Sequence, residues 1–171
     1  MREFSPTTRK AALTAHVICC ATWLGAATAM MVLIVARGRV ATSDAVFSST
    51  WLAIKTIDDW VIIAAAGASF LSGCVLCWGT KWGFFKWYWI VTKLIATAVM
   101  VAFGAFCLGP WINLATELAV DGGVKAVSTE RFGRTYALVC AFGTIQVSAL
   151  WVIFGISIFK PWGKIFPSRK K

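Results

Sequence analysis

The sequence is poor in the residues that most enzymes and metal sites need. Of its 171 residues one is histidine and seven are acidic, against seventeen lysines and arginines. There is no H-x-x-x-H cluster for di-iron chemistry, no Ser–His–Asp set for hydrolysis and no Gly-rich loop for a nucleotide. These absences argue against a metal-dependent enzyme, and we expect no catalytic or metal-ligating residue.

Long apolar stretches are what the sequence has instead. Hydrophobic residues make up 59% of the chain. Four stretches are each long enough to cross about 30 Å of hydrocarbon at about 1.5 Å per helical residue: 11–36, 57–79, 87–110 and 136–159. The segments between them are too short to fold separately. The sequence therefore predicts an all-α polytopic membrane protein, a single four-transmembrane-helix bundle over residues 1–171.

Basic residues are sorted between the two sides of these spans. The two tails and the loop between the second and third spans carry ten basic residues and one acid, Glu3, whereas the other two loops hold six basic residues and all the other acids. The positive-inside rule then places both termini in the cytoplasm, and we expect the cell inner membrane. The net charge of +10 serves topology and the anionic lipids of the bilayer, and we expect no nucleic-acid partner.

The second span carries a stripe of small residues at every fourth position: Ala65, Ser69, Gly73 and Cys77. Small residues let helix backbones approach closely in a membrane. The stripe is expected to lie inside the bundle in preference to facing a second copy, although a homo-oligomer or a partner in a membrane complex is also expected.

Tryptophans and a proline mark the ends of the spans. We expect most of the ten tryptophans to anchor at the headgroup layer, including Trp51 and Trp60 at one end of the second span. The segment 37–56 is expected to hold a short interfacial helix around Trp51. Pro110 either ends the third span or kinks it, with helix continuing over 112–120.

Several polar side chains within the spans are candidates for ligand binding. His16, with Cys20 and Trp23 on the same helix face, is either a neutral imidazole bonded to a neighbouring helix or a ligand, quinone, haem or proton site. Lys93 either extends to the headgroups or faces an anionic substrate beside His16. Gln146 is either an interhelical contact or a binding-site donor.

A second polar group lies toward the other side of the membrane. Lys55 is three and four residues before Asp58 and Asp59, and Asp58 shares the inward face of the small-residue stripe. Asn113 and Glu117 are expected to meet Asp58 there. The group is either a solvated, partly paired set of charges or a polar vestibule for a cation or proton.

The six cysteines do not indicate a redox enzyme. Cys74 and Cys77 form a C-V-L-C motif similar to that of small quinone-linked disulfide oxidases, but here it ends the second span on the basic, reducing side. We interpret these cysteines as packing residues. Whether Cys107 and Cys140 pair is left open by the sequence.

Two short motifs resemble those of a known family. His16-x6-Trp23-x-Gly25 and Lys160-Pro161-Trp162-Gly163 are similar to motifs of an uncharacterised family of small bacterial four-helix integral membrane proteins, distantly similar to the copper-resistance D membrane domain. The resemblance implies a four-helix fold in which His16 and Trp23 act together, and it implies no reaction.

The expected function is the binding or translocation of a small hydrophobic or anionic molecule within the bundle. The alternatives are a non-catalytic accessory or immunity-type subunit of a membrane complex, and a redox protein with haem or quinone at His16. We expect no other cofactor. The predicted ligand-binding residues are His16, Trp23, Lys93, Gln146, Asp58, Asp59 and Glu117.

Overall fold

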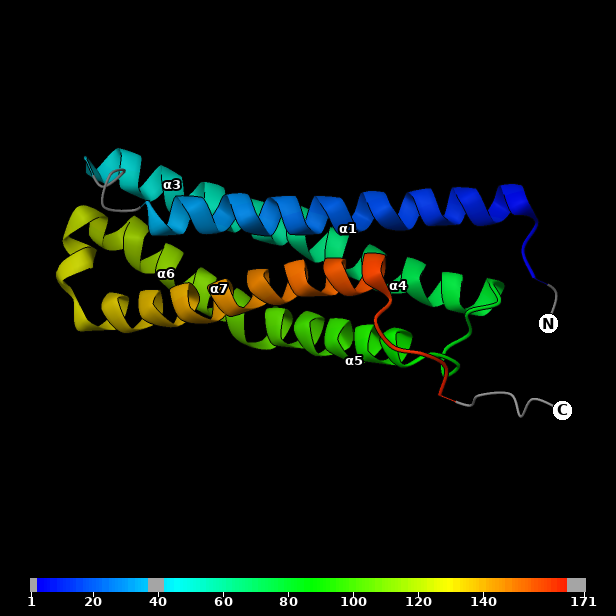
Figure 1. Cartoon of the computed structure of the whole chain (residues 1–171). Coiled ribbons are helices and arrows are strands. Elements are labelled where there is room, and N and C mark those ends of the chain that lie inside the picture. Colours follow the sequence, from blue (N-terminus) through cyan, green and yellow to red (C-terminus); the bar gives the residue numbers. More distant parts are fainter. Residues whose placement is uncertain (1–2, 37–41, 166–171) are drawn as a thin grey trace, which may run out of the picture.

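The computed structural model describes residues 3–36 and 42–165 and arranges them as four helical rods (Figure 1). No strand occurs within those ranges, and each rod is long and apolar enough to cross a membrane. The predicted all-α, four-helix membrane architecture is confirmed. The rods are α1 (Pro6–Val35); α3 (Asp44–Thr56), η1 (Ile57–Ile62) and α4 (Ile63–Gly79); α5 (Tyr88–Phe103), η2 (Gly104–Leu108), α6 (Gly109–Gly122) and η3 (Gly123–Ser128); and α7 (Glu130–Phe159).

The second and third rods are longer than predicted. They contain 36 and 41 residues, or about 54 and about 61 Å at the rise of an α-helix, which exceeds the hydrocarbon thickness. The expected helix around Trp51 is present as α3, but it continues into α4 through the π-helical turn η1. The third rod likewise continues past Pro110 through η2, so the proline does not end the span.

The rods pack most tightly at one end, which we name the α3–α6 end. Here α3 and α6 meet the last turns of α1 and the first turns of α7 (Figure 1). Phe47, Trp51 and Phe132 are at most 1% exposed, and the Trp51 ring meets the Phe132 ring edge-on with centroids 5.5 Å apart. Trp51 is therefore a core residue, and its predicted place as an interface anchor is wrong. Trp60 is 78% exposed.

The small-residue stripe of α4 packs against α1. The Ser69 hydroxyl lies 2.9 Å from the Cys20 thiol, and a Cβ on Gly73 would lie only 3.3 Å from the His16 ring. These contacts confirm that the stripe lies inside the bundle. They also set the antiparallel register of α1 and α4.

The opposite end, which we name the terminal end, holds the start of α1, the α4–α5 turn and the end of α7. The Phe4 amide donates to the Gly79 carbonyl at 2.9 Å, and the Ile165 amide donates to the Lys86 carbonyl at 3.0 Å. Both chain ends are thus tied to the same turn. Of the residues used in the charge analysis, Arg2, Arg37, Arg39, Arg169, Lys170 and Lys171 lie outside the described residues.

Candidate functional site: lysines and tryptophans at the terminal end

Lys93 is a partly buried cation on α5 without an acidic partner. Its ammonium lies 5.8 Å from the centroid of the Trp89 ring. Among the described residues the ion pairs are Lys55–Asp59 and Arg134–Glu130, both far along the chain from Lys93. An unpaired cation within a spanning helix is costly, and it is a functional candidate by default.

Lys160 joins Lys93 from the end of α7. It caps the helix in the left-handed conformation, at φ 46° and ψ 55°, which favours glycine over lysine. Its ammonium lies 4.9 Å from the centroid of Trp82 and 5.8 Å from that of Trp89, and those two rings meet edge-on at 5.4 Å. We call Trp82, Trp89, Lys93 and Lys160 the Lys–Trp cluster. Of these four residues, the sequence analysis predicted Lys93 alone as a binding residue. Lys160 was noted there only as part of the K-P-W-G motif.

The cluster presents hydrogen-bond donors without acceptors. Trp89 is 8% exposed, and its indole N–H is buried with no hydrogen-bond partner among the described residues. A buried donor left unsatisfied costs about 1–3 kcal/mol. The two ammonium groups near the Trp89 ring, neither paired with a carboxylate in the described residues, are suited to a carboxylate or phosphate group.

A basic rim extends the cluster toward the α4–α5 turn. An open pocket of about 640 Å³ lies there, lined by Lys81, Trp82, Lys86, Trp87 and Lys164. The Lys164 ammonium lies 5.5 Å from the Trp87 ring, and the Lys81 ammonium lies 5.6 Å from the Trp82 ring. Tryptophan beside lysine is the composition typical of the membrane headgroup layer.

His16 forms a hydrogen-bonded clamp between α1 and α4. The Ser72 hydroxyl donates to the Ala68 carbonyl at 2.6 Å, so His16 Nδ1–H donates to Ser72 across 2.9 Å. In this tautomer Nε2 is the acceptor, and it faces the Cys20 thiol at 3.5 Å. Both ring nitrogens therefore have partners, which fits the alternative of a neutral imidazole bonded to a neighbouring helix.

The clamp and the Lys–Trp cluster are neighbours. Lys93 interacts electrostatically with both His16 and Cys20, and no hydrogen bond joins it to either of them among the described residues. Trp23 is 3% exposed, and its indole N–H has no partner among the described residues. No hydrogen bond links Trp23 to His16 within the described part of the chain, so joint action of these two residues stays a prediction.

The remaining predicted residues lie nearer the α3–α6 end. Asp58 is buried, whereas Asp59 is exposed and pairs with Lys55 at 2.8 Å. Asn113 Oδ1 accepts from the Lys55 ammonium at 2.5 Å. The expected meeting of Asn113 and Glu117 with Asp58 is wrong, because Asn113 binds Lys55 and Glu117 lies exposed on α6. Gln146 is partly buried on α7.

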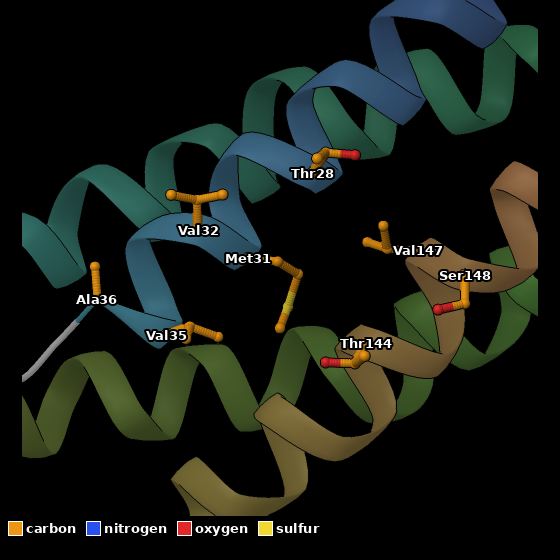
Figure 2. Close-up of a pocket in the computed structure, with 8 residues that line it drawn as sticks. All are labelled: Thr28, Met31, Val32, Val35, Ala36, Thr144, Val147 and Ser148. Carbon is orange, nitrogen blue, oxygen red and sulfur yellow. The ribbon is translucent and has the colours of Figure 1, made fainter.

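An apolar groove runs between α1 and α7 away from the Lys–Trp cluster. It has a volume of about 620 Å³, and Figure 2 shows Met31 and Thr144 reaching into it from the two helices. Thr28 also lines it, but this hydroxyl already donates to the Leu24 carbonyl at 2.7 Å. The groove is suited to an apolar chain and offers no charge for recognition.

The described residues contain neither a disulfide nor a cluster of metal-binding side chains. All six cysteines are free thiols, so Cys107 and Cys140 are not paired. No group of three or more His, Cys, Asp or Glu side chains in ranges 3–36 and 42–165 is placed to hold a metal ion.

No family model, curated protein or solved structure matches this chain, and the family resemblance stays a prediction.

Proposed function

We propose that this protein binds the anionic head of a small amphiphilic molecule at the Lys–Trp cluster. The observation that carries the proposal is the pair of ammonium groups on Lys93 and Lys160, both within 6 Å of the Trp89 ring and neither paired with an acid in the described residues. The sequence predicts a ligand that is either hydrophobic or anionic, and we now propose a single ligand with an anionic head and a hydrophobic part.

The chemistry of the cluster favours an amphiphile over a free ion. The ammonium groups would neutralise a carboxylate or phosphate. The indole faces and the exposed apolar side chains of α5, such as Ile95 at 59% exposure, would accept the ligand's hydrocarbon part. Such a ligand could reach the site sideways from the bilayer.

The orientation belongs to the same proposal. The described lysines of the terminal end include Lys81, Lys86 and Lys164, which line one pocket, and the positive-inside rule would place this end in the cytoplasm of a bacterial inner-membrane protein. The ligand would then be held at the cytoplasmic leaflet. Nothing in the geometry favours the accessory-subunit alternative, and the occupied nitrogens of His16 argue against haem ligation there.

Calorimetric titration of the purified full chain in maltoside detergent tests the proposal, with dodecyl phosphate as the probe. We expect Lys93→Gln and Lys160→Gln each to weaken binding about tenfold or more, since each removes one charge-assisted contact. Lys125→Gln is the matched control, because Lys125 is an exposed lysine at the α3–α6 end. Equal affinity in all four proteins would overturn the proposal.

Two further probes define the ligand class. Inorganic phosphate should bind far more weakly than dodecyl phosphate if the hydrocarbon part contributes, and dodecyl trimethylammonium should not compete. Equal binding of inorganic phosphate would show a free-anion site in place of an amphiphile site. Competition by the cationic amphiphile would show that apolar contact alone accounts for binding.

A further inference from the structure

The second and third rods change from α- to π-helix at the same level of the bundle. Asp58 lies in η1, and its carboxylate Oδ2 would be 3.8 Å from a Cβ placed on Gly109, the residue directly after η2. π-Turns are rare, occur mostly as single turns within α-helices, and are frequent at functional sites. Here two of them face each other with a carboxylate between them.

The Asp58 carboxylate is buried without a partner. The residue is 8% exposed, and no hydrogen bond to its side chain is found in the described part of the chain. The nearest cation, Lys55, is already bound to Asp59 and Asn113. A buried, ionised carboxylate that lacks both an ion pair and hydrogen bonds is strongly disfavoured.

Gly104 and Gly109, at the two ends of the η2 turn, lie against polar side chains from two other rods. The Gly109 amide donates to the Gly104 carbonyl across the π-turn, and a Cβ on Gly104 would lie 3.5 Å from Gln146 Nε2. Neither glycine has a side chain to keep Asp58 or Gln146 away from the backbone of η2. We call Asp58, Gly104, Gly109 and Gln146 the central polar layer, and it draws on three of the four rods.

Among the described residues the layer offers a metal cation few free oxygen atoms, namely those of the Asp58 carboxylate and the Gln146 amide. The Gly104 carbonyl already accepts from Gly109, and the oxygens of Asp59 and Asn113 accept from Lys55. Sodium or calcium requires several oxygen ligands arranged around it. A single carboxylate in apolar surroundings can instead be neutralised by one proton.

We propose that Asp58 is a reversible proton-binding site within the membrane-spanning bundle. Ionisation would release the proton to water through the Lys55–Asp59 pair, whose side chains are 36% and 39% exposed. Asp59 directly follows Asp58, and Lys55 lies about one helical turn before it. Lys55, three residues before Asp58, would then have a second carboxylate to bind. Transfer of Lys55 to Asp58 would break its bond to Asn113 and so loosen α3 from α6.

The groups around the site are few. The charged groups that act on the Asp58 carboxylate are Asp59 and Lys55, on its own rod. The α1 segment that packs on η1 lies well beyond His16 and Cys20, which pair with α4 at Ser72 and Ser69. The uncharged titratable side chains on the neighbouring helices toward this level are Cys107, Cys140 and Tyr136.

Carbodiimide labelling of the full wild-type chain in lipid nanodiscs tests the proposal. Dicyclohexylcarbodiimide is apolar and adds to protonated carboxyl groups that lie in apolar surroundings. Mass spectrometry of the digested protein should find the adduct on Asp58, with a yield that falls as the pH rises. Asp59→Asn should leave this adduct in place, and Asp58→Asn should remove it.

Three outcomes would overturn the proposal. The first is protection of Asp58 by sodium chloride but not by choline chloride at constant pH, which would identify a sodium site. The second is an adduct on Asp58 whose yield does not depend on pH. The third is the absence of both the adduct and any infrared carboxyl C=O band that distinguishes wild type from Asp58→Asn, provided that circular dichroism shows the variant to be helical.

Discussion

The α3–α6 end and the terminal end are built from the same four rods, yet they are packed in opposite ways. At the α3–α6 end Phe47, Trp51 and Phe132 fill a core in which each of them is at most 1% exposed. At the terminal end Lys93 has no acidic partner, and the Trp89 N–H has no acceptor, among the described residues. The α3–α6 end is therefore a closely packed apolar core, whereas the terminal end contains polar groups without partners in the described residues.

The surroundings of each end explain the difference. The second and third rods are too long for the hydrocarbon layer, so the α3–α6 end extends beyond it, with Glu117 and Asp121 exposed on α6. In water the hydrophobic effect drives aromatic side chains into a core. Within lipid that drive is absent, and helices associate through small residues and hydrogen bonds, as in the His16 clamp.

The largest effect should come from removing an aromatic residue from the α3–α6 core. Trp51→Ala is expected to lower the free energy of unfolding by about 3–5 kcal/mol, because it leaves a cavity against Phe132. Trp60→Ala, at a tryptophan that is 78% exposed, is the matched control and should change it little. Unfolding in mixed micelles, followed by circular dichroism, measures both. Equal losses would show that this end is not a water-like core.

A smaller loss should follow from crowding α1 against α7. A Cβ on Gly143 would lie 2.6 Å from Met31 Sδ, so Gly143→Ala forces the methionine to move and should cost about 1–3 kcal/mol. Gly155 lies on the same helix, nearer the terminal end, with no atom within 4 Å of such a Cβ. Gly155→Ala should be neutral or slightly stabilising in the same assay. A reversed order of the two variants would contradict this packing.

Lys160→Gly should separate stability from binding at the terminal end. Glycine adopts the left-handed conformation without strain, so the variant is expected to gain about 1 kcal/mol of stability. The same change removes one ammonium from the Lys–Trp cluster and should weaken dodecyl phosphate binding about tenfold. Thermal unfolding and titration calorimetry measure the two effects. A variant with lower stability and unchanged affinity would make Lys160 a structural residue only.

The smallest effect is expected at the His16 clamp. Ser72→Ala removes the acceptor for His16 Nδ1–H and should cost about 0.6 kcal/mol, the average for an interhelical hydrogen bond in a membrane protein. Ser157→Ala is the control, because this hydroxyl bonds only to the Ile153 carbonyl of its own helix. The difference in the free energy of unfolding between the two variants, measured in mixed micelles, gives the contribution of the His16–Ser72 hydrogen bond. A loss above that of Gly143→Ala would show that the terminal end depends on polar contacts more than its packing indicates.

Of the four residues of the Lys–Trp cluster, the sequence analysis identified Lys93 alone. Lys93 stood out because a charge in an apolar run is visible without a structure, and its predicted place beside His16 followed from equal depth. Trp89 was assigned to the interface with the other tryptophans, since its unsatisfied N–H depends on what surrounds it. Lys160 joins the cluster only because α7 ends in a left-handed turn.

The errors in the predicted fold share one cause. Hydropathy marks where a helix can lie in lipid, but it does not mark where that helix ends in water. Residues 44–56 were therefore taken for an interfacial segment, and continuation of the helix over 112–120 was only one of two alternatives, although α3 and α6 continue the spans. The π-turns that join them depend on helix-to-helix packing, to which a hydropathy pattern does not respond.

The sequence by itself determined the number of spans, the all-helical class and the sorting of charge between the two ends. These follow from composition along the chain, because each span must satisfy its own backbone within hydrocarbon. Only the tertiary structure decided which polar groups are paired. Among the described residues Lys55 binds Asp59 and Asn113 and not Asp58. In the same ranges Lys93 shares the Trp89 ring with Lys160 and has no acidic partner. Partners for a polar side chain come from neighbouring helices, and their register is set by packing.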